Sequence, residues 1–162
     1  MFNMNIFTAI NNGNKVLKKN GIKSSQLDCE LLMSKVIKRK KKDILINLDK
    51  QLTEENLEYF DYLIEQRSKG KPIAYLINKK EFWKYEFYVS EEVLIPRPDT
   101  EIIVEQALSL TKHKSQLNIL DIGIGSGCII LSILKEKKSF YGTGIDISKE
   151  TLNICKINSN KL

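Results

Sequence analysis

Apolar residues recur every three or four positions through residues 1–72, which is the spacing of helices that bury one face. The spacing predicts a first helix over residues 5–20, in which Gly13 is a weak point. A second helix is predicted to begin at Ser24 or Ser25, because either hydroxyl can cap the free backbone N–H groups of a first turn.

A further helix is predicted from Thr53, the capping residue, to Gly70. Residues 1–72 are therefore interpreted as a small helical bundle whose role is structural or recognises a partner. The apolar positions of the first helix are Ile6, Phe7, Ile10, Val16 and Leu17. The predicted buried positions of the other two helices are Leu27, Leu31, Leu32, Val36, Leu57, Phe60, Leu63 and Ile64.

The pattern changes in residues 73–95, where aromatic and β-branched residues lie between charged turns. This composition predicts a β-hairpin that links two domains. Packing between the domains is favoured for the aromatic side chains over a binding site built from them. The residues concerned are Phe82, Trp83, Tyr85, Phe87, Tyr88 and Val89.

Pro96 and Pro98 hold the backbone around Arg97 in an extended conformation, just before a predicted helix that Asp99 or Thr100 caps. That helix carries Ile102, Ile103, Ala107 and Leu108. One reading makes Arg97 a contact for an anion or substrate. The other makes it a member of a surface ion pair at a rigid domain boundary, and both stay open here.

A short apolar strand from Asn118 to Asp121 leads into glycines at positions 123, 125 and 127, and an apolar helix follows. A second strand over residues 140–147 carries Asp146, nineteen residues past Gly127. Strand, glycine-rich turn and helix form the first half of a nucleotide-binding βαβ unit, and a carboxylate at this spacing can accept hydrogen bonds from ribose hydroxyls. The third glycine comes one residue too early for a dinucleotide fingerprint, which favours a S-adenosylmethionine loop over an NAD loop.

Composition narrows the function classes further. The hydrophobic fraction of 42% is enough for a packed core, and no apolar run is long enough to span a bilayer. Three separated cysteines and a single histidine, His113, predict reduced thiols, a cytoplasmic location and no metal site. The net charge of +6 includes the basic run 38–42, which is read as a solvated loop in preference to an aid in meeting RNA.

Several motifs, in this order, resemble the release-factor glutamine N5-methyltransferases of the HemK/PrmC type. The glycine loop is common to many S-adenosylmethionine enzymes, whereas the proline–arginine run reached through an aromatic hairpin is far more specific. The motifs are Pro72-Ile73-Ala74-Tyr75-Leu76, Glu81-Phe82-Trp83, Leu94-Ile95-Pro96-Arg97-Pro98-Asp99-Thr100-Glu101, and Ile119 through Gly127.

The resemblance implies an α/β architecture: a helical substrate-recognition domain at 1–72, a β-hairpin linker at 73–95, and the first part of a class I, Rossmann-like methyltransferase domain at 96–162. It implies methyl transfer from S-adenosylmethionine to the Gly-Gly-Gln glutamine amide of peptide-chain release factors, in translation termination. No membrane, metal or direct nucleic-acid partner is expected. The implied cofactor residues are Asp121, Gly123, Ile124, Gly125, Ser126, Gly127 and Asp146, and the implied substrate loop is Arg97, Pro98 and Thr100.

The family's Asn-Pro-Pro-Tyr motif is absent, since no Asn-Pro pair occurs anywhere in the sequence. We therefore expect a truncated chain with no catalytic residue of its own, in which residues 118–162 are less stable than the bundle. Methylation of a nucleic-acid base amine and a non-catalytic binding fragment are the alternative functions. NAD-dependent oxidation is disfavoured by the glycine spacing.

Overall fold

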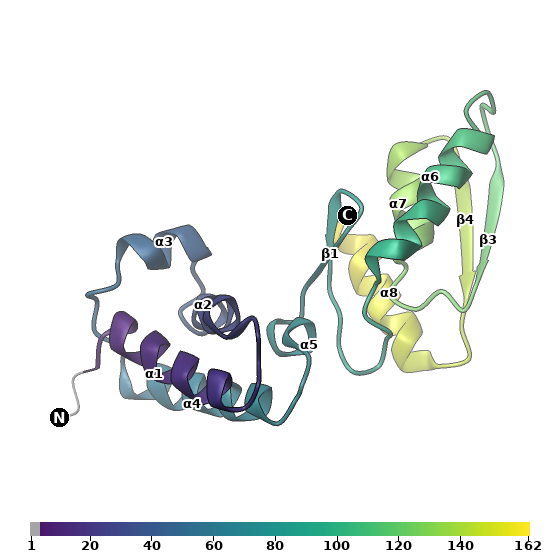
Figure 1. Cartoon of the computed structure of the whole chain (residues 1–162). Helices are drawn as coiled ribbons and strands as arrows, with labels where there is room; N and C mark the ends of the chain where they lie inside the picture. The colour runs from purple at the N-terminus through teal and green to yellow at the C-terminus, as the bar shows by residue number, and fades with distance from the viewer. Residues whose placement is uncertain (1–3) are drawn as a thin grey trace. The chain divides into compact units, whose positions relative to one another are not determined.

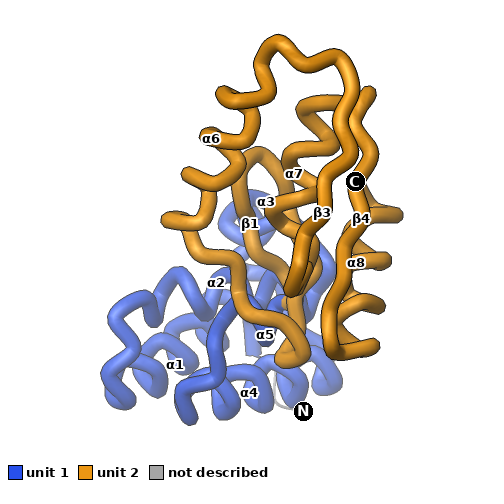
Figure 2. The backbone as a smooth tube through the Cα atoms, turned by 90° about the vertical axis from the view of Figure 1, so that its right-hand side faces the viewer, with its two compact units in different colours: residues 1–77 blue, residues 78–162 orange. Residues whose placement is uncertain are grey.

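The computed structural model describes residues 4–162, and the chain divides into two compact units, residues 1–77 and 78–162 (Figure 2). The first unit is helical and the second combines helices with strands (Figure 1). A helical bundle followed by a hairpin and a βαβ unit confirms the predicted fold class.

The first unit owes its helices to the apolar periodicity and to well-placed caps. Thr53 Oγ1 accepts a hydrogen bond from Asn56 N at 3.2 Å, so the predicted cap is confirmed. Ser24 lies at the start of its helix, but its side chain makes no capping hydrogen bond. The helices are α1 (Ile6–Lys19), α2 (Ser25–Val36), α3 (Lys41–Ile46), α4 (Glu54–Ser68) and α5 (Ile73–Ile77).

The bundle buries some small residues and exposes some large apolar ones. Leu27 was predicted in the core but is 46% exposed, and in α1 the apolar residues Phe7 and Val16 are 52% and 43% exposed, whereas Ala9 is buried. Gly13 is also buried, and a Cβ there would lie 2.9 Å from Ile64 Cδ1. Gly13 is therefore not a weak point of α1, because the missing side chain lets α1 approach α4 closely.

The second unit begins with the hairpin formed by β1 (Lys80–Phe82) and β2 (Tyr85–Phe87), in which Phe82 pairs with Tyr85. Residues 73–77, predicted as part of the hairpin region, form α5 instead. Phe82 and Phe87 are buried in one cluster with Val104 and Phe140, so these two rings belong to the core of the second unit.

Glu136 fixes the hairpin through polar contacts. Its Oε1 accepts hydrogen bonds from the Trp83 indole N–H and the Tyr85 hydroxyl, each at 3.2 Å, and pairs with Lys84 Nζ at 2.9 Å. The hydrogen bond with Lys84 is the main cause that lowers the pKa of Glu136. These contacts hold the hairpin against the helix that ends at Glu136.

The remaining elements form a βαβ unit preceded by a helix. The strands β3 and β4 pair in parallel, with Asp121 opposite Gly144 and Ile122 opposite Ile145. The elements are η1 (Pro98–Thr100), α6 (Glu101–Leu110), β3 (Asn118–Ile122), α7 (Cys128–Glu136), β4 (Tyr141–Ile145) and α8 (Lys149–Lys161).

The two faces of this sheet differ. Ile119 packs against residues of α7, and a Cβ on Gly142 would lie within 2.8 Å of Ile130 Cδ1, so helix and strand are in close contact. Side chains alternate along a strand, so every second residue points to the opposite face. On that face Leu120, Ile122 and Tyr141 are 58%, 75% and 64% exposed. In α6, Val104 is buried, whereas Ile102 and Ile103 are 59% and 50% exposed.

Candidate functional site

The glycine-rich loop joins the carboxyl end of β3 to the first turn of α7. All three glycines have positive φ, at 78° for Gly123, 57° for Gly125 and 80° for Gly127. A Cβ on Gly123 would meet no atom within 4 Å, and one on Gly125 would meet only the Gly123 carbonyl at 3.9 Å. The backbone at positions 123 and 125 is therefore open to a ligand that approaches closely.

Gly127 has a different role, because a Cβ at that position would lie 2.8 Å from both Cys155 Sγ and Leu131 Cδ1. The loop is further fixed by the carbonyl of Ile145, which accepts hydrogen bonds from Gly123 N at 2.9 Å and Ile124 N at 3.0 Å. The Ile124 side chain is buried. The loop thus combines an open edge with a closely packed base.

Asp146, directly after β4, lies at the rim of this loop. Its Oδ2 accepts a hydrogen bond from Gly125 N at 3.1 Å, and its Oδ1 accepts one from Ser148 N at 3.2 Å. These backbone hydrogen bonds, that of Gly125 first, lower the pKa of the Asp146 carboxyl. The group is therefore ionised at neutral pH, and each oxygen keeps acceptor capacity for a ligand hydroxyl.

Asp121 has the opposite environment. It points to the face of β3 that carries Ile119, and burial raises the pKa of its carboxyl. Burial, and then the charge of Asp121, raise the pKa of the Cys155 thiol. Asp121 thus lies toward the helices, whereas Asp146 lies at the open edge of the loop.

The proline–arginine loop has an exposed arginine. Arg97 is extended, with φ −97° and ψ 141°, and Pro98 to Thr100 form a 3-10 turn in which Thr100 N donates to Arg97 O at 3.0 Å. Within residues 4–162 the Arg97 side chain makes no hydrogen bond or ion pair, so the ion-pair reading is wrong. The predicted side-chain cap at Thr100 is also absent.

Asn158 of α8 is a site residue that the sequence analysis missed. It is fully buried, and its Nδ2 donates to the carbonyl of Ser126 in the glycine-rich loop at 2.8 Å. A signal for it was present, because Thr151, Ile154, Cys155 and Asn158 follow the spacing of one buried helix face. A polar residue on such a face needs hydrogen-bond partners.

The part of the chain that the structure describes has neither a cluster of metal-binding side chains nor a membrane-spanning helix. Among residues 4–162 no group of three or more histidine, cysteine, aspartate or glutamate side chains could hold a metal ion. No helix in that range has both the length and the apolar content that crossing a membrane requires.

Residues 8–77 match the family described as the PrmC N-terminal domain. The chain is 44% identical over 147 residues to the "Release factor glutamine methyltransferase" of Buchnera aphidicola subsp. Acyrthosiphon pisum. The aligned residues make up 91% of this chain and 53% of that protein. The chain is 39% identical over 153 residues to the protein of the same name from Fusobacterium nucleatum, covering 94% and 42%. A "Bifunctional methyltransferase" of Rickettsia typhi is 35% identical over 170 residues, covering 94% and 33%.

The chain spans about half the length of the release factor glutamine methyltransferases from Buchnera that it matches. The helical bundle comes first in the chain, and the parallel strand pair with its glycine-rich loop follows, which is the order that the motif resemblance implies. Over the part of those proteins that it spans, the chain is similar to the release factor glutamine methyltransferases, and its residues 8–77 match the PrmC N-terminal domain.

Proposed function

We propose that this chain provides the S-adenosylmethionine site for methyl transfer to the Gly-Gly-Gln glutamine amide nitrogen of peptide-chain release factors. The observation that carries the proposal is the open backbone at Gly123 and Gly125 with the ionised Asp146 hydrogen-bonded at its rim. The names of the relatives supply the reaction and the substrate class.

The residues present fit this cofactor. The open positions at Gly123 and Gly125 leave room for a nucleoside against the backbone, and Asp146 offers acceptors for two vicinal ribose hydroxyls. Ile124, Ser126 and Gly127 hold the loop in shape from its packed side. Asp121 is proposed to border the cofactor from the carboxyl end of β3, where burial raises the pKa of its carboxyl.

When bound, S-adenosylmethionine supplies an electrophilic methyl group on its sulfonium. An amide nitrogen is a poor nucleophile, so the reaction depends on orientation and on exclusion of water. We propose that Arg97, Pro98 and Thr100 form a substrate-contacting loop, in which the exposed guanidinium is free to pair with an anionic group of the release factor. No residue of this chain is proposed to accept the amide protons of the glutamine.

The test is calorimetric titration of the whole chain with S-adenosylmethionine. Asp146→Ala removes the charge-assisted contacts with the ribose hydroxyls, so affinity should fall by at least about tenfold. Glu150→Ala is the matched control, because it removes an exposed carboxylate four residues further along. Absence of binding by the native chain, or equal affinity of Asp146→Ala, contradicts the proposal.

The acceptor is tested separately with radiolabelled S-adenosylmethionine, offering a release factor in one reaction and tRNA or DNA in another. Label in the Gly-Gly-Gln peptide supports the proposed substrate, and label in nucleic acid supports a base-amine methyltransferase. Cofactor binding without label in either acceptor identifies the chain as a binding module.

A further inference from the structure

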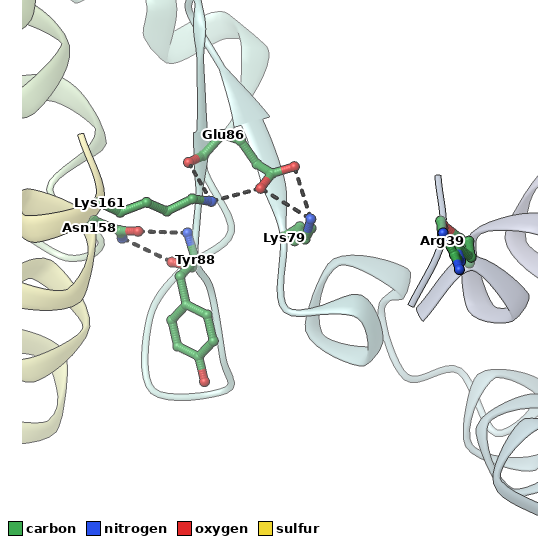
Figure 3. A network of polar contacts seen from close by, with 7 residues as sticks. Arg39, Lys79, Glu86, Tyr88, Asn158 and Lys161 are labelled. Carbon is green, nitrogen blue, oxygen red and sulfur yellow. Dashed lines mark hydrogen bonds and ion pairs between the residues drawn. The ribbon is translucent and has the colours of Figure 1, made fainter. Parts of the chain in front are cut away.

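The Asn158 side chain joins two segments that are distant in sequence. Its Oδ1 accepts a hydrogen bond from Tyr88 N at 2.6 Å, and its Nδ2 donates to Tyr88 O at 3.0 Å (Figure 3). The same Nδ2 donates to Ser126 O at 2.8 Å. Both amide protons and the carbonyl oxygen of this one residue are thus used between the glycine-rich loop and the strand exit at Tyr88.

Two further contacts hold the same strand exit along α8. Thr151 Oγ1 donates to the Glu92 carbonyl at 2.8 Å. Lys161 Nζ pairs with Glu86 Oε1 at 2.7 Å, and Lys79 Nζ pairs with the same oxygen at 3.3 Å (Figure 3). Residues 86–92 therefore lie alongside α8, and the chain continues directly from them into the loop that presents Arg97.

Asn158 is the member of this contact set that is completely buried, whereas Lys161 and Glu86 have side chains that are 43% and 40% exposed. A leucine would continue the apolar face of α8 at this position. It would leave Tyr88 N, Tyr88 O and Ser126 O without the partner that Asn158 supplies, and unpaired buried polar groups are strongly disfavoured. The side chain that meets these three groups must have two donors and one acceptor, which is an amide.

We propose that Asn158 is a positioning residue that fixes the glycine-rich loop and the segment leading to Arg97 in one arrangement. It would act on cofactor affinity through Ser126, without contacting the cofactor itself. The functional roles of the glycine-rich loop and of the Arg97 loop rest on the proposed function. The hydrogen bonds of Asn158 that connect the two are present without any ligand, so they can be tested separately.

The first measurement is amide hydrogen exchange of the unliganded chain. Asn158→Asp replaces the donor with an oxygen that faces two carbonyls, so exchange at Tyr88, Gly125 and Gly127 should be at least tenfold faster. Exchange in β3 and α6 should keep the native rate. Asn153→Ala is the matched control, because Asn153 is an exposed asparagine of the same helix.

Thr151→Val distinguishes loss of the Asn158 hydrogen bonds from a general destabilisation of α8. It removes only the contact with the Glu92 carbonyl, so exchange should increase near Glu92 and stay unchanged at Gly125. If Asn158→Asp does not fold, Asn158→Ser is used in its place, because it is shorter and keeps a donor. Faster exchange spread evenly over the second unit, or confined to one of the two segments, overturns the proposal.

The second measurement is titration of the same variants with S-adenosylmethionine. Asn158→Asp should bind at least tenfold more weakly than the native chain, and Asn153→Ala should bind equally well. A native chain that does not bind contradicts the proposed function, whereas the exchange data alone still decide the role of Asn158. Native affinity in Asn158→Asp overturns its role in positioning the cofactor loop.

Discussion

Replacing Gly144 with alanine tests how the glycine-rich loop is seated on the sheet. Gly144 lies in β4, and a Cβ there would be 1.8 Å from Ile124 Cδ1, 2.9 Å from Cγ1 and 3.2 Å from Cβ of the same side chain. Rotation of Ile124 could move its terminal carbon but not its Cβ, so relief requires a shift of the loop backbone. The substitution should therefore destabilise the second unit and displace the loop.

The magnitude follows from two opposing effects. Overpacking of a filled core costs about 1–3 kcal/mol, and the overlap at Gly144 belongs at the upper end of that range. Alanine in a strand gains about 0.5–1 kcal/mol over glycine, since the unfolded chain loses conformational freedom. The expected net loss is about 2 kcal/mol, or a fall in Tm of about 8–16 °C for a unit of this size.

The assay is urea unfolding followed by tryptophan fluorescence, because Trp83 is the one tryptophan of the sequence and lies in the second unit. Ile124→Ala alone should cost about 2 kcal/mol or more. Combined with Gly144→Ala it removes the two nearest atoms, so the double variant should be about 1–2 kcal/mol more stable than additivity predicts.

Gly142→Ala is the control within the same strand. Its Cβ would meet the ends of two flexible side chains, Leu134 Cδ1 at 2.7 Å and Ile130 Cδ1 at 2.8 Å, and not Ile124. The stability lost on Gly142→Ala should be the same with or without Ile124→Ala. If Gly144→Ala is as stable as the native chain, or if Ile124→Ala does not relieve it, the proposed seating of the loop is wrong.

Three further outcomes are expected. Backbone hydrogen bonds, that from Gly125 N first, lower the pKa of Asp146. The hydrogen bond between Gly125 N and the Asp146 carboxylate should therefore hold at neutral pH and be lost only as pH falls through the lowered pKa. The measurement is the NMR chemical shift of the Gly125 amide against pH, and a midpoint at or above the ordinary aspartate value of about 3.9 contradicts this expectation. Burial first, and then nearby carboxylates, raise the pKa of Cys29 to about 12, so iodoacetamide at pH 8 should label Cys29 only as fast as the bundle unfolds, as mass spectrometry would show. Asp28→Ala leaves Arg67 without the carboxylate that it meets at 2.6 Å, which should cost about 3–5 kcal/mol by urea unfolding followed by circular dichroism, whereas Asp28→Leu with Arg67→Met should cost far less.

The helices of the bundle could be predicted from the sequence because their periodicity and caps are local. Thr53 caps α4, as predicted, and Ser148 caps α8 in the same way through a hydrogen bond from Thr151 N at 3.1 Å. The faces of the helices were less predictable. Phe7 is as apolar as Ile6, yet only Ile6 is buried, since the positions of α2 and α4 and not residue type decide which side of α1 is covered.

The limits of the hairpin could not be predicted in detail. Residues 73–77 are apolar and β-branched enough to suggest a strand, but they form α5. Lys35 Nζ donates to the Leu76 carbonyl at 2.6 Å, which is a contact between residues far apart in sequence. Pro72, just before Ile73, is the local signal that could have predicted a helix start here.

The glycine-rich loop is held from two sides, the strands and the helices, and a sequence motif describes only the strand side. Glycine spacing and Asp146 describe the strand side, where Gly125 N meets the carboxylate. The helix side depends on contacts of Gly127 with Leu131 and Cys155, and on the amide of Asn158. Asn158 lies beyond every residue that the motif includes, yet without it the carbonyl of the loop and the strand exit lose a shared partner. A matching glycine pattern therefore predicts the open edge of such a loop, whereas its rigidity depends on a buried polar residue of the following helix.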